Sequence, residues 1–192
     1  TNPSLMKQAG RQDTDALLKE ICDLVQGPVS GEVTALEADG MIAEGKRLAA
    51  ISDHLVVKVP TTYEGLKAMA ALSGEGIPVN ATLVFSTNQA LLVAKTGAAY
   101  VSPFIGRLDD IGEDGMQLIS DTLEVYQNYD LQTEVIVASV RHPMHVVDSA
   151  LLGADIATIP PGVIKKLVAH PLTDKGLAAF MADWEKLQGG KG

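Results

Sequence analysis

Short apolar runs alternate with segments of helical period along almost the whole chain. Runs rich in Val, Ile and Leu predict six strands, at residues 28–33, 55–60, 79–85, 100–105, 134–140 and 155–159. Between these runs, apolar residues recur every three or four positions, as is typical of helices that pack one face on a core. The alternation indicates a repeated β-α unit.

Several polar residues mark where the predicted helices begin and end. Helix starts are predicted at Asp13 or Thr14, at Thr61 with Glu64, at Ser86 with Gln89, and at Pro143. Residues 107–115 are interpreted as a polar loop. Two helices close the chain, the second with Leu177, Phe180, Met181, Trp184 and Leu187 on one stripe. We expect this helix, residues 173–187, to pack on its own domain or on a neighbouring subunit.

Strands that are almost continuously apolar, such as residues 55–57 and 135–137, indicate a parallel sheet covered by helices on both faces. Either an open doubly wound sheet or a TIM (β/α)8 barrel would fit. The dinucleotide-binding version has no support, because no glycine-rich fingerprint follows a strand. A barrel needs eight strands, and the pattern predicts six plus a remnant that ends at Thr1. We therefore expect a barrel whose first β-α portion is missing from this chain.

Composition narrows the class of protein. The 192 residues carry 24 acidic and 15 basic side chains, a net charge of −9, which argues against a nucleic-acid partner. With 46% apolar residues and no run long enough to span a membrane, one domain over residues 1–192 is expected. A single cysteine, Cys22, indicates a reducing compartment, so we expect the cytoplasm. The four histidines lack metal-ligand spacing, and no metal or other cofactor is predicted.

Polar residues stand where almost every predicted strand ends. These residues are Asn2, Glu32, Lys58, Asn80, Thr82, Ser102 and Ser139, with Arg107 and Arg141 just beyond two of the strands. In parallel α/β proteins, ligands bind at the carboxyl ends of the strands. The sequence therefore predicts a site at that end of the sheet.

Lys58 is the strongest single signal, because it interrupts an apolar strand where an ammonium group is costly to bury. Burial lowers a lysine pKa and frees the neutral amine to attack a carbonyl carbon. The alternative is a structural lysine paired with Glu32. Glu32 itself can be a general acid and base, a counter-ion, or both.

The remaining polar residues have two interpretations each. Thr82, Ser102 and Ser139 can satisfy backbone groups, but together with Asn80 they also match the needs of a polyhydroxylated carbonyl substrate. Arg107 and Arg141 suit a phosphate, although either can be a surface ion pair.

Several stretches resemble the small transaldolases, a family that also contains fructose 6-phosphate aldolases. They are residues 1–4 (TNPS), 55–60 (LVVKVP), 80–85 (NATLVF), 101–107 (VSPFIGR), 109–115 (DDIGEDG), 137–141 (VASVR) and 153–155 (GAD). The likeness extends in order over essentially the whole chain.

The resemblance implies a metal-free class I aldolase barrel in which Lys58 forms a Schiff base with a ketose phosphate. It also implies that Asn2, Glu32, Asn80, Thr82 and Ser102 surround the reacting carbons, and that Arg107, Ser139 and Arg141 hold the phosphate. Phe104 and Glu32 resemble the residues of the transaldolases, because the aldolases of the family tend to carry a tyrosine and a glutamine at these positions. Arg141 also fits the transaldolase pattern. A ring-shaped homo-oligomer, a pentamer or a decamer, is implied as well.

The chain departs from this family in one respect. The family's first strand ends in an aspartate that handles the proton of the C4 hydroxyl, and no such strand is present in these residues. We expect a missing acid and base to cost ~10²- to 10⁴-fold in rate, unless the segment precedes these residues or is supplied separately. The rival hypotheses are a fructose 6-phosphate aldolase and a non-catalytic sugar phosphate-binding or structural fragment.

Overall fold

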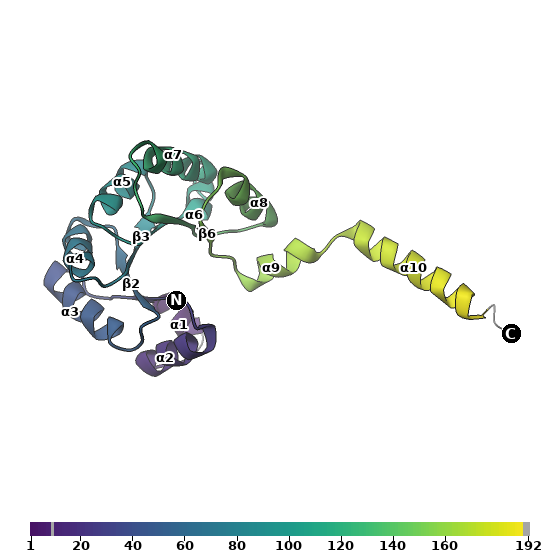
Figure 1. Ribbon diagram of the computed structural model, residues 1–192, viewed down its shortest axis with the longest axis horizontal. Helices are drawn as coiled ribbons and strands as arrows, with labels where there is room; N and C mark the ends of the chain where they lie inside the picture. Colours follow the sequence, from purple (N-terminus) through teal and green to yellow (C-terminus); the bar gives the residue numbers. More distant parts are fainter. Residues whose placement is uncertain (9, 190–192) are drawn as a thin grey trace.

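A computed structural model describes residues 1–8 and 10–189. Six parallel strands form one sheet in the order β1-β2-β3-β4-β5-β6. They are β1 (Val29–Glu32), β2 (Leu55–Pro60), β3 (Val79–Val84), β4 (Tyr100–Pro103), β5 (Glu134–Val137) and β6 (Ile156–Ala157). The sheet curls with helices on its outer side, as part of a barrel does (Figure 1). The number of internal strands and their parallel arrangement confirm the prediction.

Helices precede, connect and follow the strands. They are α1 (Pro3–Gln8), α2 (Thr14–Val25), α3 (Ala38–Ala49), α4 (Tyr63–Gly74), α5 (Thr87–Lys95), α6 (Ile105–Asp109), α7 (Gly115–Asn128), α8 (Pro143–Leu152), α9 (Pro161–Val168) and α10 (Pro171–Gly189). Ser86 caps α5 by accepting from the Gln89 amide at 3.2 Å, as predicted. Gly153 ends α8 in the left-handed conformation, at φ 79°.

The core lies between the outer face of the sheet and the surrounding helices. Val57, Val79 and Val101 are fully buried there, together with Met69 and Leu72 of α4. A Cβ added to Gly45 of α3 would lie 2.9 Å from Leu72 and 3.1 Å from Val57, so the glycine lets these elements approach closely. The helices thus fill the space outside the strands, and the inner face is left for polar side chains.

Several predicted boundaries are wrong in detail. Thr62, not Thr61, caps α4 by accepting from the Gly65 amide at 2.9 Å, and the Thr61 hydroxyl instead donates to the Thr82 carbonyl. The strands from β3 onward end before the limits predicted from the sequence, and the predicted loop at 107–115 begins inside helix α6. The last helix begins two residues before the predicted range of 173–187 and ends two residues after it.

The two ends of the curled sheet, β1 and β6, are its edge strands among the described residues. Thr1 and Asn2 belong to no strand, so the predicted remnant ending at Thr1 is not seen, and helix α1 follows directly. Thr1 nevertheless lies beside β1, because its nitrogen donates to the Ser30 carbonyl at 2.6 Å. What the structure describes is therefore a six-stranded half-barrel.

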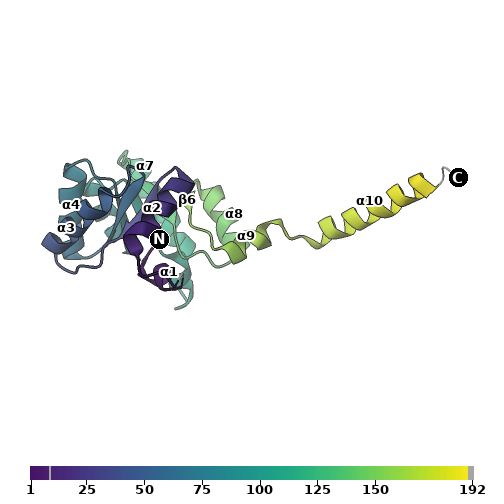
Figure 2. The same cartoon turned by 90° about the horizontal axis from the view of Figure 1, so that it is seen from below.

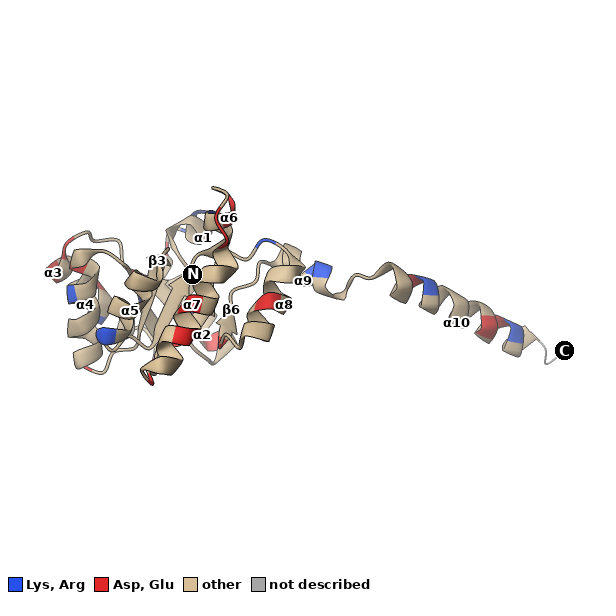
Figure 3. Ribbon diagram, turned by 90° about the horizontal axis from the view of Figure 1, so that it is seen from above, with Lys and Arg blue, Asp and Glu red and all other residues tan. Residues whose placement is uncertain are grey.

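Helix α9 contacts α8 and buries Val163, and α10 extends beyond it, away from the half-barrel, as a long arm (Figures 1 and 2). The stripe predicted on α10 is exposed along its length: Leu177 60%, Phe180 73%, Met181 51%, Trp184 56% and Leu187 69%. Charged residues of both signs lie on the outer helices and on this arm (Figure 3). None of the helices in the described part of the chain is both long enough and apolar enough to cross a bilayer.

Candidate active site

Strand register brings Glu32, Lys58 and Asn80 together. Glu32 pairs with Lys58 in the β1–β2 ladder, and Lys58 pairs with Asn80 in the β2–β3 ladder. Residues paired across parallel strands point to the same face of the sheet. Val57 and Val59, next to Lys58, are buried in the core on the opposite face. The three polar side chains therefore lie side by side on the inner face, at the carboxyl ends of their strands, as predicted.

Lys58 and Glu32 form a largely buried ion pair. Lys58 Nζ lies 3.5 Å from Glu32 Oε2, and the two side chains are 12% and 16% exposed. Burial lowers the pKa of Lys58, the positive charge of Arg107 acts in the same direction, and the Glu32 carboxylate opposes both. The net effect is a lowered pKa, which increases the fraction of the neutral amine, the nucleophilic form, at a given pH.

Asn80 joins three strands through its side-chain amide. Ser102 Oγ donates to Asn80 Oδ1 at 2.8 Å, and Asn80 Nδ2 donates to Ser30 Oγ at 2.9 Å. Ser102 and Asn80 are buried, so this chain of hydrogen bonds fixes the amide beside Lys58. Ser30 was missed by the sequence analysis. Its position two residues before Glu32, on the same face of the strand, is the signal that could have found it.

Thr82 and Asn2 lie at the margins of this cluster. Thr82 is 1% exposed and follows Asn80 on the same face of β3, paired with Pro60. Asn2 caps helix α1, since its Oδ1 accepts from the Leu5 amide at 2.9 Å. Asn2 and Glu32 both line a cavity of about 380 Å³ between α1, α2 and α3. The structure therefore places Asn2 near Glu32 but gives it a capping contact rather than one with Lys58.

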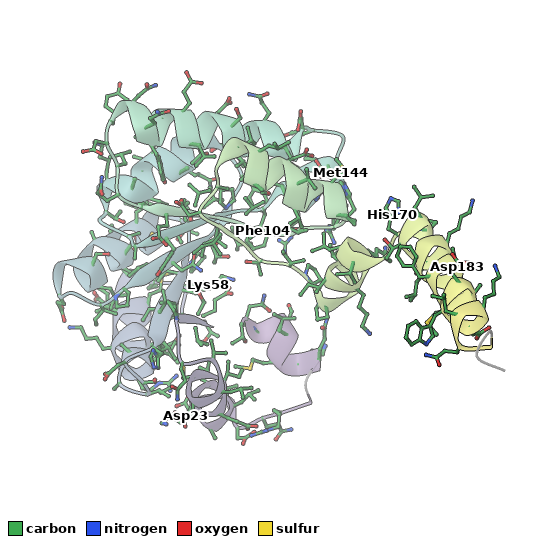
Figure 4. All side chains as sticks on the ribbon, turned by 45° about the vertical axis from the view of Figure 1, so that its right-hand side comes forward. Asp23, Lys58, Phe104, Met144, His170 and Asp183 are labelled. Carbon is green, nitrogen blue, oxygen red and sulfur yellow. The ribbon has the colours of Figure 1, made fainter. Side chains whose placement is uncertain are left out.

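Phe104 lies close to both the lysine and the first arginine. The centroid of its ring lies 6.0 Å from Lys58 Nζ and 5.0 Å from the Arg107 guanidinium carbon. The Phe85 ring packs edge-on against it, with the two ring centroids 5.8 Å apart. The Phe104 backbone pairs with Ala138 beyond the end of β5, so the side chain is held at the carboxyl end of the sheet. Figure 4 shows Lys58 and Phe104 on the concave side of the half-barrel.

Ser139 and Arg141 lie on the loop between β5 and α8, close to α6. A Cβ on Gly106 would lie 2.2 Å from the Ser139 carbonyl oxygen and 2.6 Å from Arg141 Nε, so only glycine fits there. Ser139 has φ 64°, a conformation that L-residues rarely adopt. The Arg141 guanidinium donates to Asp110 Oδ2 at 2.7 Å, an exposed ion pair. Arg107 on α6 and Ser139 and Arg141 on the loop after β5 thus lie on elements that pack closely together.

Asp109 and His145 support this second region and were not singled out from the sequence as site residues. His145 Nε2 lies 3.0 Å from Asp109 Oδ2, and His145 Nδ1 accepts from the Arg141 amide at 3.2 Å. Among the described residues, no group of three or more His, Cys, Asp or Glu side chains is arranged to hold a metal ion.

The site therefore has two parts with different chemistry. One part, the lysine end, holds a buried amine, a carboxylate and hydrogen-bonding groups around it, which suits covalent attack on a carbonyl carbon followed by proton transfer. The other part, the arginine end, presents two guanidinium groups and a hydroxyl, which suits an anion such as a phosphate. Phe104 lies near Lys58 of the first part and Arg107 of the second, and its ring adds an apolar surface.

Comparisons with known proteins show the family to which the chain belongs. The chain matches the family model described as Transaldolase/Fructose-6-phosphate aldolase over residues 1–190. It is similar to a "Probable transaldolase" of Methanococcus maripaludis (strain C5 / ATCC BAA-1333), 61% identical over 185 residues, which are 96% of this chain and 86% of the relative.

Two further relatives come from other organisms. A "Probable transaldolase" of Maricaulis maris (strain MCS10) is 61% identical over 186 residues, covering 97% of this chain and 85% of the relative. One of Anaeromyxobacter sp. (strain Fw109-5) is 59% identical over 187 residues, covering 97% and 86%. These matches confirm the resemblance found in the sequence: the chain belongs to the transaldolase/fructose-6-phosphate aldolase family.

Proposed function

We propose that the protein is a transaldolase, a transferase of aldehyde and ketone residues that forms a Schiff base with its substrate through Lys58. The observation that carries this proposal is the lysine itself, which is largely buried on the inner face of the sheet and lies 3.5 Å from Glu32. Burial lowers its pKa. A purely structural ion pair would not need the hydrogen-bonded amide of Asn80 beside it. Membership in the transaldolase/fructose-6-phosphate aldolase family supports the same role.

The first half of the reaction builds a covalent intermediate on Lys58. The neutral amine attacks the ketone carbon of a ketose phosphate, and the carbonyl oxygen takes up a proton to give a carbinolamine. Loss of water then forms an iminium ion. Glu32 donates and accepts the protons of these steps, with a water held by Thr82. Asn80 and Ser102 hydrogen-bond the substrate hydroxyls near the reacting carbons.

Cleavage uses the iminium ion as an electron sink. The electrons of the C3–C4 bond move toward the iminium nitrogen as the C4 hydroxyl loses its proton, and an aldose phosphate leaves. In the family that the sequence resembles, an aspartate on a preceding strand takes this proton. The three-carbon enamine stays on Lys58 until a second aldose phosphate accepts it, and hydrolysis of the new iminium ion releases the product.

The arginine end gives the substrate class. We assign the phosphate to Arg107, Arg141 and Ser139, which lie together on α6 and the loop after β5. The proposed donors are sedoheptulose 7-phosphate or fructose 6-phosphate, and the acceptors are glyceraldehyde 3-phosphate or erythrose 4-phosphate. These are the exchanges of the non-oxidative pentose phosphate pathway.

Phe104 favours transfer over simple aldol cleavage. Its ring lies 6.0 Å from Lys58 Nζ, packed against Phe85. A phenyl ring has no hydroxyl with which to hold a water or to protonate the enamine, so the three-carbon unit is kept for an acceptor. By resemblance, the aldolases of this family tend to have a tyrosine here.

The test is product analysis after incubation with fructose 6-phosphate, with and without erythrose 4-phosphate. We expect sedoheptulose 7-phosphate to form in the presence of the acceptor, and no free dihydroxyacetone to accumulate in its absence. Accumulation of dihydroxyacetone would make the protein an aldolase. Binding of fructose 6-phosphate that is the same in Lys58→Met, with no product in either protein, would make it a non-catalytic binding protein.

Assembly and location complete the proposal. The exposed apolar stripe of α10 suits packing on a neighbouring subunit, in line with the pentamer or decamer that the resemblance implies. A cytoplasmic location agrees with the single buried cysteine. Sedimentation of the protein, and of a variant with Phe180 and Trp184 changed to serine, tests the role of the helix in assembly.

A further inference from the structure

His145 is a buried histidine that lies outside the two groups of residues to which the mechanism gives a role. It belongs to the first part of α8 and is 5% exposed. Its imidazole touches two other parts of the fold. Nδ1 lies 3.2 Å from the Arg141 amide nitrogen, and Nε2 lies 3.0 Å from Asp109 Oδ2 at the end of α6.

These two contacts assign the proton of the imidazole. The Arg141 amide is a donor, so Nδ1 must accept and cannot carry a proton. Nε2 therefore carries the proton and donates it to the Asp109 carboxylate. Burial lowers the pKa of His145 and His142 acts in the same direction, while Asp109 and Asp148 oppose them. The neutral ring has one acceptor and one donor, and each has the partner that it needs.

Asp109 carries the connection further. Its second oxygen, Oδ1, accepts from the amide of Gly115, the first residue of α7, at 3.0 Å. The pair therefore ties together the end of α6, the start of α7 and the loop after β5. Arg107 lies on α6, and Ser139 and Arg141 lie on that loop.

The Arg141 side chain is held far less firmly than its backbone. Its guanidinium is paired with Asp110, and the two side chains are 50% and 60% exposed. Such an exposed pair contributes little to stability and exchanges readily with a bound anion. The part-buried bond from the Arg141 amide to His145 has no such competitor, because its acceptor ring is 5% exposed. The backbone therefore stays in place while the guanidinium is free to turn toward a ligand.

From this arrangement we infer that His145, together with Asp109, is a positioning residue that holds the Arg141 backbone and α6 in register for the phosphate of the substrate. The inference rests on the proposed function and deepens it, since it concerns affinity for the phosphate rather than the chemistry at Lys58. His145 touches neither substrate nor the reacting atoms in this role.

Two variants separate the contacts. H145L fills a similar volume but removes both hydrogen bonds. H145N retains an acceptor near the position of Nδ1 and loses the link to Asp109. His54, an exposed histidine near the start of β2, serves as the control in H54A. Far-ultraviolet circular dichroism and thermal unfolding establish that each variant is folded.

The measurement is trapping of the lysine adduct by borohydride, with two sugars. Fructose 6-phosphate carries the phosphate, whereas dihydroxyacetone reports Lys58 without it. We expect the half-saturating concentration of fructose 6-phosphate to rise about tenfold in H145L and about threefold in H145N, the scale of one or two net hydrogen bonds. Trapping by dihydroxyacetone should stay within about twofold of the unmodified protein in both variants, and H54A should match it with both sugars.

The outcomes are distinct. An equal loss with both sugars would overturn the inference, since His145 would then act on the whole fold, and so would no loss with fructose 6-phosphate. If H145L does not fold, the comparison of H145N with the unmodified protein on the two sugars still tests the inference. Failure of the unmodified protein to be trapped by either sugar would instead contradict the proposed function.

Discussion

The lysine end and the arginine end of the site are built in different ways. Lys58 and Glu32 stand on adjacent strands and are 12% and 16% exposed, whereas Arg141 and Asp110 stand on a loop and a helix end and are 50% and 60% exposed. Charges interact more strongly when they are buried, so the lysine end can alter the pKa of its groups. The exposed arginine end acts by placing charges where an anion can meet them. We therefore expect changes at the lysine end to reduce the rate and changes at the arginine end to reduce affinity.

Replacement of Lys58 is expected to have the largest effect on activity. Lys58→Met removes the nucleophile, and we expect transfer to fall by roughly 10⁴-fold or more, the scale of losing a covalent nucleophile. The matched control is Lys67→Met on α4, whose ammonium is paired with Glu64 and 52% exposed. Steady-state assays of both variants test this. Equal activity in the two variants would show that Lys58 has no catalytic role.

Glu32→Gln keeps the shape of the side chain and removes its charge. We expect a fall in kcat of about 10²- to 10⁴-fold, as for the loss of a general acid and base. The Glu32 carboxylate raises the pKa of Lys58, so its loss lowers that pKa further. More neutral amine is then present at a given pH, and the acid limb of the pH profile for borohydride trapping should move to lower pH. A limb that moves to higher pH, or stays in place, would contradict this assignment.

At the arginine end, Arg141→Lys tests whether geometry matters beyond charge. A lysine retains the positive charge but cannot present the guanidinium fork, so we expect KM for the phosphorylated ketose to rise about 10- to 100-fold. The value of kcat should change little, because Lys58 is untouched. Initial-rate kinetics separate the two quantities. A drop in kcat with an unchanged KM would remove the distinction between the two ends.

Gly106→Ala tests the close packing of the arginine end without removing a charged group. The added Cβ would lie 2.2 Å from the Ser139 carbonyl oxygen, which is backbone, so the loop must move. We expect KM to rise about tenfold with a smaller change in kcat, from a misplaced binding group. Gly74→Ala, where an added Cβ meets nothing within 4 Å, is the control. Similar kinetics in both variants would show that the contact is unimportant.

The smallest expected effect belongs to Ser102→Ala. This change removes the hydroxyl that donates to Asn80 Oδ1 at 2.8 Å and leaves that buried oxygen short of a partner. We expect the free energy of unfolding to fall by about 1 to 3 kcal/mol. Urea denaturation measures it. An unchanged stability would mean that water replaces the hydroxyl and that the chain of hydrogen bonds is less rigid than proposed.

The two ends also differ in how far the sequence predicts them. Lys58 and Asn80 are visible because they interrupt apolar strands, and a regular parallel sheet then places neighbouring strand ends together. Helix α6 has five residues, too few to show a periodic pattern, so the sequence predicts part of a loop there. The link between Asp109 and His145 joins distant parts of the chain and depends on loop geometry, which local pattern does not carry.

The predicted strands were close to those observed, but the later ones were too long. Apolar runs continue past the last ladder pair where the chain turns into a loop or short helix, as at residues 138–140 after β5. Ser139 adopts a positive φ there, which ends the extended conformation. Nothing in the residue type announces this, because serine has no special preference for that region. The bend brings the Ser139 carbonyl close to Gly106 of α6, a tertiary contact that local sequence does not predict.

The central claim is that Lys58 forms a Schiff base with a ketose phosphate. The direct measurement is intact-mass spectrometry after incubation with fructose 6-phosphate and borohydride, followed by peptide mapping. We predict a single three-carbon adduct on the peptide that contains Lys58, absent in Lys58→Met and present in Lys67→Met. A protein that gains no mass, or that carries the adduct on another lysine, would contradict the account.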